Sequence, residues 1–220
     1  ISSAGFKKWL PLTKTKMSLI HNMKYNYESH INSDYVINKD HKEAIVIAYI
    51  GLVDYFSTNV KLIDALKNNT NYKLQYSGIV SSNCKIIEYV KTEKIDNVIF
   101  TGPFNNEDKP QIHKKVDMIN ALYGNDNLIV TTALPNKLYD AIIYRKPIIV
   151  SKGTYLGEVV ENFKIGIAID VEYDDIKQKI QDFWYNFEVE EFYKNCDELL
   201  KMFNEEQKNT IKDILNFVNQ

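Results

Sequence analysis

Residues 133–151 read ALPNKLYDAIIYRKPIIVS, and three kinds of local structure follow one another within this stretch. Pro135 predicts an extended entry, the residues after it have the spacing of a short helix, and Pro147 begins an apolar run that predicts a strand. Lys137 and Asp140 lie three residues apart, so their side chains leave the same face of the first helical turn. The stretch therefore predicts a loop, a helix with a charged first turn, and a strand.

The first turn of this helix is suited to binding an anion. Backbone N–H groups without helical partners and the positive end of the helix dipole meet there. A lysine in a first turn is electrostatically unfavourable unless a bound anion offsets it, whereas a carboxylate can accept hydrogen bonds from two hydroxyl groups. Lys137 and Asp140 therefore predict a nucleotide site, and a solvent-exposed helical turn is the alternative interpretation.

Short apolar runs alternate with helical patterns through the middle of the chain. These patterns predict strands over 44–50, 73–79, 97–100, 147–151 and 165–169, and helices over 59–66, 85–92, 111–115 and 154–162. The apolar runs 118–123 and 128–131 are assigned to neither type, and 124–127 between them predicts a turn. Strands that are apolar throughout and alternate with helices indicate a parallel sheet covered on both faces. The sequence therefore predicts an α/β, doubly wound, Rossmann-like fold.

Several turn residues are expected at the carboxyl edge of this sheet, where doubly wound folds bind their ligands. Gly51 would let backbone N–H groups approach a phosphate, with an ordinary strand-ending glycine as the alternative. Gly102 and Phe104 would present backbone and an aromatic face to a base, unless Phe104 faces the core. The loops at Pro135 and Gly153 fall at the same edge, so the candidate loops converge on one rim.

From Asp174 onward the sequence predicts helices only, over 176–187, 188–203 and 205–218. Aromatic side chains recur along these helices at helical spacing, which is typical of a core or an interdomain contact. They are Phe183, Trp184, Phe187, Phe192, Tyr193 and Phe203.

Composition and charge exclude several classes of function. The net charge of -2 and pI near 6.1 give no electrostatic footprint for nucleic-acid binding. No apolar run approaches the roughly 18 residues of a membrane span, so we expect a cytoplasmic protein. No GxGxxG, P-loop or GxSxG pattern occurs, which argues against a dinucleotide fold, a P-loop nucleotidase and a serine hydrolase.

Metal and disulfide chemistry are also not expected. Cys84 and Cys196 are far apart and unclustered, so they predict neither a zinc site nor a disulfide framework but buried or idle thiols. No paired aspartates suited to a metal-bound diphosphate occur. The histidines show no ligand spacing and are expected at the surface or in loops: His21, His30, His41 and His113.

Four motifs carry a resemblance to a known family: YIG at 49–51, NVIFTG at 97–102, ALPNKLYDA at 133–141 and KPIIVSKGT at 146–154. From about 44 to 170 the chain resembles the C-terminal, donor-binding domain of a retaining GT-B fold glycosyltransferase of bacterial surface polysaccharides. The resemblance implies that Asp140 holds the ribose hydroxyls of a donor nucleotide. The donor-site residues that we predict are Gly51, Gly102, Phe104, Thr132, Pro135, Lys137 and Asp140.

The chain departs from the family pattern in places that concern charge. Asp140 is a shorter acid than the family's glutamate, and Arg145 stands where the family has glycine. Thr132 occupies the place of an acidic residue that meets the donor sugar, and Leu52 occupies that of an arginine after the first strand. We hypothesise that Lys137 supplies the missing positive charge.

The resemblance implies a division of the chain and a reaction. Residues 1–42 would end an N-terminal domain and linker, 43–173 would bind the nucleotide sugar, and 174–220 would pack on this domain and toward the N-terminal one. The chain begins at Ile1 in mid-pattern, which suggests an excised piece. Catalytic groups and the acceptor site would lie largely in the missing half, so the chain alone would bind its donor without turnover.

The expected reaction transfers a hexose-type sugar from a UDP- or GDP-linked donor to a glycan or lipid-linked acceptor, without metal or cofactor, in capsule or lipopolysaccharide synthesis. Peripheral contact of the full enzyme with the inner face of the membrane is a further expectation. The alternatives are a GT-B sugar-nucleotide epimerase and a non-catalytic flavodoxin-like nucleotide-binding domain.

Overall fold

The computed structural model of the chain describes residues 2–9, 17–23, 36–37, 39 and 43–219. Within them, six strands form one sheet in the order β3-β2-β1-β4-β5-β6, and every strand pair is parallel. The strands are β1 (Ile45–Ile50), β2 (Tyr72–Ser77), β3 (Val98–Gly102), β4 (Met118–Ala121), β5 (Ile148–Ser151) and β6 (Gly166–Ile169). This order is that of a doubly wound sheet, which confirms the predicted Rossmann-like α/β class.

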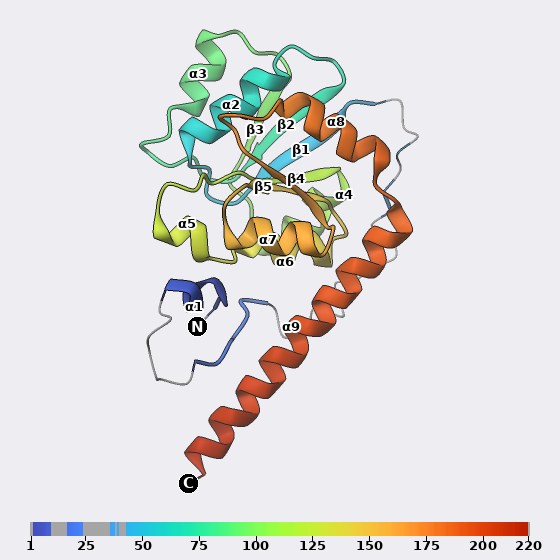
Figure 1. The fold of residues 1–220 in the computed structure, drawn as a ribbon. Coiled ribbons are helices and arrows are strands. Elements are labelled where there is room, and N and C mark those ends of the chain that lie inside the picture. The colour runs from blue at the N-terminus through green and yellow to red at the C-terminus, as the bar shows by residue number, and fades with distance from the viewer. Residues whose placement is uncertain (1, 10–16, 24–35, 38, 40–42, 220) are drawn as a thin grey trace.

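Helices cover both faces of the sheet (Figure 1). One face carries α2 (Phe56–Leu66), α3 (Ile86–Thr92) and α8 (Ile176–Asn186). The other carries α4 (Lys109–Lys114), α5 (Leu128–Thr132), α6 (Asn136–Ile143) and α7 (Tyr155–Asn162). The remaining helical elements are α1 (Gly5–Trp9), the 3₁₀ turn η2 (Asn106–Asp108) and the long α9 (Val189–Val218).

The central strand β1 shows why the sheet needs two covered faces. Its side chains alternate between the faces, as the pleat requires. Ile47 and Tyr49 join the large core, while Ala48 and Ile50 form a smaller buried cluster with Val116. Both sets are apolar, because neither face of this strand meets water.

Most predicted elements are confirmed with shifts of one to three residues at their ends. The unassigned run at 118–123 contains strand β4, and 128–131 lies in helix α5. Asn127 caps α5, because its side chain accepts hydrogen bonds from the N–H groups of Ile129 and Val130, both at 3.1 Å.

The prediction of two helices over 188–203 and 205–218 is wrong, since α9 is continuous for 30 residues. The residues at the expected junction, Asn204 and Glu205, include neither glycine nor proline, so nothing in the backbone ends the helix there.

The expected aromatic stripe is confirmed as core: Trp184, Phe192 and Phe203 are buried in it.

Arg145 attaches α9 to the end of α6. Its guanidinium donates to the Tyr193 carbonyl oxygen at 2.9 Å and pairs with the Asp197 carboxylate, and the residue is 9% exposed. Its backbone has φ 54°, in the left-handed region that costs an L-residue about 1–2 kcal/mol and suits glycine. The side-chain contacts with α9 offset that backbone cost.

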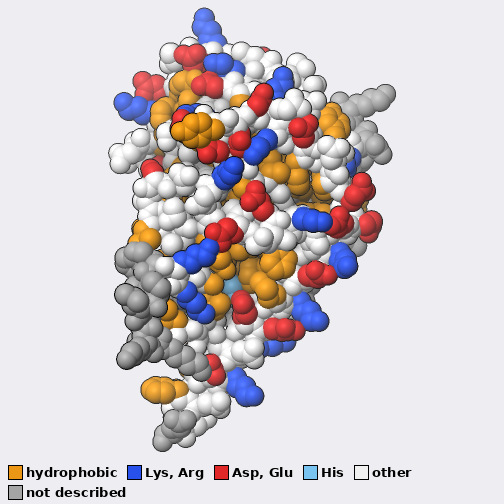
Figure 2. Space-filling model, viewed as in Figure 1, with side chains coloured by type: hydrophobic (Ala, Val, Ile, Leu, Met, Phe, Trp, Pro, Cys, Tyr) orange, Lys and Arg blue, Asp and Glu red, His pale blue; other side chains and the backbone are white. Residues whose placement is uncertain are grey.

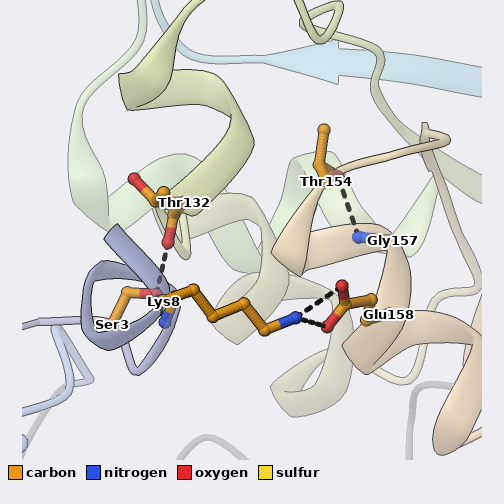
Figure 3. A network of polar contacts seen from close by, with 7 residues as sticks. Ser3, Lys8, Thr132, Thr154, Gly157 and Glu158 are labelled. Carbon is orange, nitrogen blue, oxygen red and sulfur yellow. Dashed lines mark hydrogen bonds and ion pairs between the residues drawn. The ribbon is translucent and has the colours of Figure 1, made fainter. Parts of the chain in front are cut away.

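The segment at the N-terminal end of the described chain packs against α5 and α7 (Figure 3). Ser3 Oγ donates to the Thr132 carbonyl oxygen at 2.5 Å, and Lys8 pairs with Glu158 on α7. A Cβ on Gly5 would lie 2.3 Å from the Thr132 carbonyl oxygen, so the helix α1 can approach this closely only with glycine there. The Lys8 pair is exposed and adds little stability.

His21 lies in an irregular segment, so the prediction of a surface or loop position holds for the loop, but its side chain is buried. Its Nδ1 lies 3.1 Å from the Tyr139 hydroxyl and its Nε2 lies 2.7 Å from the Glu206 carboxylate. The ring also stacks on Phe203 at 4.1 Å between centroids. One histidine therefore joins the segment 17–23 to both α6 and α9.

His113 is likewise buried rather than exposed. It stacks on Tyr144 at 4.1 Å between ring centroids, and within the described residues neither ring nitrogen has a hydrogen-bond partner. Burial, together with the nearby Lys109 and Lys146, lowers the pKa of His113 to about 3, so the ring is neutral. His30 and His41 lie outside the described residues, as does most of the predicted segment 1–42.

Arg145 offers a direct test of the backbone cost at the α6 end. Arg145→Ala and Arg145→Gly remove the same contacts with α9, so both should lower the free energy of unfolding by about 1–3 kcal/mol. Because φ is positive, the glycine variant should be the more stable of the two by about 1 kcal/mol, measured by urea denaturation. An alanine variant as stable as the glycine variant would contradict this assignment.

Candidate nucleotide site

The strand order reverses between β1 and β4, and the loops that leave the two strands diverge at their carboxyl ends. Gly51 follows β1 with φ 124°, and Gly102 ends β3 with φ 76°. A Cβ at either glycine would meet no atom within 4 Å. Their backbones are linked, because Gly51 N–H donates to the Ser77 carbonyl and Gly78 N–H to the Gly102 carbonyl, both at 2.8 Å. The two predicted glycines therefore line one rigid, open rim.

Lys137 reaches this rim from the first turn of α6. Its Nζ lies 3.4 Å from the ring centroid of Tyr49 and 4.9 Å from that of Tyr123. It also donates a hydrogen bond to the Tyr123 hydroxyl oxygen at 3.0 Å, and the residue is only 6% exposed. The amine is thus held by two aromatic rings at the place where β1 and β4 separate.

Lys137 and the rings of Tyr49 and Tyr123 form what we call the Lys137 cage. The electrostatics of this cage favour a bound anion. Burial lowers the pKa of Lys137 well below its usual range; the Asp140 carboxylate opposes this shift and the Lys109 ammonium adds to it. Burial also raises the pKa of Tyr49 and of Tyr123, so both rings stay neutral. A bound anion near Nζ would favour the charged amine that burial disfavours.

Asp140 is paired with Lys109, which the sequence did not single out. Its Oδ2 lies 2.7 Å from Lys109 Nζ at the start of α4, and the two side chains are 16% and 17% exposed. Lys137 lies in the first turn of α6, as predicted, but the prediction for Asp140 is wrong, because Asp140 is the fifth residue of the helix and the first turn contains no acid. The two side chains also have different closest partners. The carboxylate faces the Lys109 ammonium, and the Lys137 amine faces the tyrosines.

The loop between β1 and α2 is held in place by hydrogen bonds from the Asn59 side chain. Asn59 donates to the carbonyl oxygens of Asp54 at 3.1 Å and of Tyr55 at 3.0 Å, while its own side-chain oxygen accepts from Asn120 at 2.9 Å. Tyr55 has φ 58° and places its ring 4.8 Å from that of Tyr123. Hydrogen bonds from Asn59, which is itself bonded to Asn120, therefore fix the loop that places Tyr55 beside Tyr123.

The other predicted residues are placed less directly. Phe104 is partly buried and packs against the small cluster of Ala48 and Ile50, so contact with a base stays a prediction. Pro135 immediately precedes α6 in an extended conformation. Thr132 donates to the Leu128 carbonyl oxygen at 2.7 Å, so its side chain is used within α5.

Tyr49, Tyr123 and Lys109 are the residues of this site that sequence reasoning missed. A signal existed for each. Both tyrosines shortly precede a glycine at the end of a predicted strand or apolar run. Lys109 begins a helix just before Pro110, so the argument that a cation is unfavourable in a first turn applied to it as well.

A large cavity in the described residues lies away from this site. It has a volume of about 610 Å³ and runs along β6, α8 and α9, where Phe183, Phe187 and Phe192 line it. No residue of the Lys137 cage lines it. Its size therefore does not make it the better candidate, because the buried charges converge at the β1–β4 edge.

The surface of the molecule is mixed in charge. Figure 2 shows lysines, arginines and acids interspersed over the face in view. The described residues contain no group of three or more His, Cys, Asp or Glu side chains arranged to hold a metal ion. None of the helices in the described ranges is long and apolar enough to cross a membrane.

Comparisons with known proteins bear on this site. The family profile described as "Glycosyl transferases group 1" matches residues 29–198. No curated protein matches the sequence. Three solved structures that resemble this chain are each less than 25% identical to it, so they support the fold alone.

Three solved structures share the fold. Staphylococcus aureus TarM, solved with fondaparinux, α-GlcNAc-glycerol and UDP, has a TM-score of 0.66 and 15% identity, over 97% of this chain and 42% of TarM. Anabaena HepE, solved with UDP and glucose, has a TM-score of 0.68 and 12% identity, over 99% of this chain and 62% of HepE. The pneumococcal O-GlcNAc transferase GtfA, solved with UDP and GlcNAc, has a TM-score of 0.61 and 16% identity, over 95% of this chain and 42% of GtfA. The chain thus spans 42–62% of the length of these relatives.

The cost of burying Lys137 predicts an unusual mutant. Lys137→Met keeps the shape of the side chain and removes the buried amine, so near pH 7 we expect it to raise the free energy of unfolding by about 1 kcal/mol. The unfolded chain keeps the Lys137 proton up to about pH 10.4, whereas the folded chain releases it earlier. Wild-type stability should therefore rise with pH relative to the variant.

Thermal melts of both proteins between about pH 6 and pH 10 check this prediction, with Lys115→Met on an exposed lysine as the control. A Lys137→Met protein that is less stable than wild type at every pH would show that the amine stabilises the fold instead.

Proposed function

The chain belongs to group 1 of the glycosyl transferases, and from that premise we propose that it is the half of a retaining GT-B enzyme that binds a nucleoside-diphosphate sugar. The single observation that carries this proposal is the placement of the Lys137 amine. It is buried at the point where the strand order reverses, and tyrosines rather than a carboxylate surround it. A buried cation in such surroundings is suited to a diphosphate.

The proposed roles follow from the positions of the groups. Lys137, the first turn of α6 and the backbone at Gly51 bind the diphosphate and stabilise the charge that develops on it as the sugar leaves. Asp140 accepts hydrogen bonds from the ribose hydroxyls. Gly102 and Phe104 border the base.

The sugar is proposed to lie beyond the diphosphate, near Pro135 and Thr132 at the junction of α5 and α6. Thr132 would contribute little through its hydroxyl, which already bonds within α5. The structure of this junction favours a donor that relies on backbone and water contacts for its sugar hydroxyls rather than on an acidic side chain.

The rest of the enzyme is proposed from the family. Residues 1–42 end the N-terminal domain and linker, 43–173 bind the donor, and 174–220 pack on this domain and toward its partner. The acceptor is a glycan or a lipid-linked glycan, met by the N-terminal domain, and the donor is UDP- or GDP-linked. A role in capsule or lipopolysaccharide synthesis, with peripheral contact at the membrane, completes the proposal.

Isothermal titration calorimetry with UDP and GDP tests donor binding by the chain. We expect one of the two to bind, and Lys137→Met to weaken that binding at least tenfold because the diphosphate loses its buried cation. Lys115→Met, which removes an equal charge from the surface, should bind as wild type does. Hydrolysis or transfer of a donor sugar by the chain alone is not expected.

Two results would contradict the proposal. Absence of binding to either nucleotide would remove the nucleotide site altogether. Equal affinity of wild type and Lys137→Met for the nucleotide would leave the site but remove Lys137 from it. The stability measurement on the same variant separates lost binding from lost folding.

A further inference from the structure

The contact between Lys109 and Asp140 joins two helices that are distant in sequence. Lys109 begins α4 and Asp140 lies in α6, and their charged atoms are 2.7 Å apart. Both side chains are mostly shielded from water, at 17% and 16% exposure, so the pair is stronger than an exposed one. Nothing in the family pattern quoted above places a lysine at this position.

The backbone of Lys109 is fixed before its side chain makes this contact. Asn105 and Asp108 form a reciprocal capping box around η2, in which Asn105 N–H donates to an Asp108 carboxylate oxygen at 2.9 Å. Pro110 restricts the first turn of α4, and Phe104 packs into the small core just before. The backbone from which the Lys109 side chain extends toward Asp140 is therefore fixed.

Asp140 has a second cation close by. Lys137 is three residues earlier on the same helix, a spacing at which an acid and a lysine pair readily. The pKa of the Lys137 amine is affected by both Asp140 and Lys109, so the three charges are within range of one another. With Lys109 absent, the carboxylate would turn toward Lys137.

This rotation of the Asp140 side chain would remove the proposed functions of both Lys137 and Asp140. A carboxylate closed onto Lys137 would occupy the amine that a diphosphate needs. The same contact would take the oxygens that accept from ribose hydroxyls. Aspartate is short enough to be held by Lys109 without reaching into the tyrosine cage, which gives a physical reason for the shorter acid in this chain.

We propose that Lys109 is a positioning residue, which holds the Asp140 carboxylate away from Lys137 so that the acid stays available to ribose and the amine to diphosphate. The proposal rests on the proposed function, because it assigns a role within that nucleotide site. Lys109 itself need not touch the nucleotide.

Calorimetry with UDP and 2′-deoxy-UDP tests it, or with the guanine pair if GDP is the nucleotide bound. Wild type should bind the ribonucleotide about tenfold more tightly, because Asp140 accepts from the 2′-hydroxyl. Lys109→Met should lose most of this discrimination and bind the ribonucleotide at least tenfold more weakly. Lys109→Arg, which keeps the ion pair, should restore the discrimination, and Lys115→Met should leave it unchanged.

Asp140→Asn separates this proposal from the function on which it rests. If Asp140→Asn abolishes the discrimination but Lys109→Met keeps it, Lys109 does not position the acid and only the further inference fails. If wild type and Asp140→Asn discriminate equally, or not at all, the ribose role of Asp140 fails. Lys109→Gln provides a second uncharged variant if the methionine protein does not fold, as judged by circular dichroism.

Discussion

The reversal of strand order between β1 and β4 is the constraint on which the rest of this structure depends. Chain segments that leave β1 and β4 must cross to opposite faces of the sheet, so their loops separate at the carboxyl edge. Tyr49 from β1, Tyr123 after β4 and Lys137 from α6 meet in the space between them. No single element could form this cage, because β1, the segment after β4, and α6 each contribute one of its side chains.

Within that space the energetics of one amine set the character of the site. Removing Lys137 from water is costly, and the two neutral tyrosine rings compensate for only part of the cost. A nearby carboxylate would compensate more fully, but Lys109 holds Asp140 at a different contact. The site thus keeps a buried amine without a paired carboxylate among the described residues, and an incoming diphosphate would favour its charged form.

The chain departs from the family pattern that its sequence resembles at several positions, among them Leu52 and Arg145. Leu52 follows the first strand where the family pattern has an arginine, and the lysines near this edge are Lys109 on α4 and Lys137 on α6. Arg145 stands where glycine is expected and still has the left-handed backbone that favours glycine. Hydrogen bonds from the Arg145 side chain to α9 offset the cost of this backbone conformation, which glycine would adopt without strain.

The sequence by itself determined the parallel sheet, most of its strands and helices, and the rim formed by Gly51 and Gly102, because these follow from periodicity and turn chemistry within a few residues. It did not assign β4 or α5. The one-turn relation of Lys137 and Asp140 was equally local. Only the tertiary structure decided the partners of these two side chains and the burial of His21 and His113. The physical reason is that burial and charge pairing depend on which distant elements the strand crossovers bring together, and no local spacing specifies that.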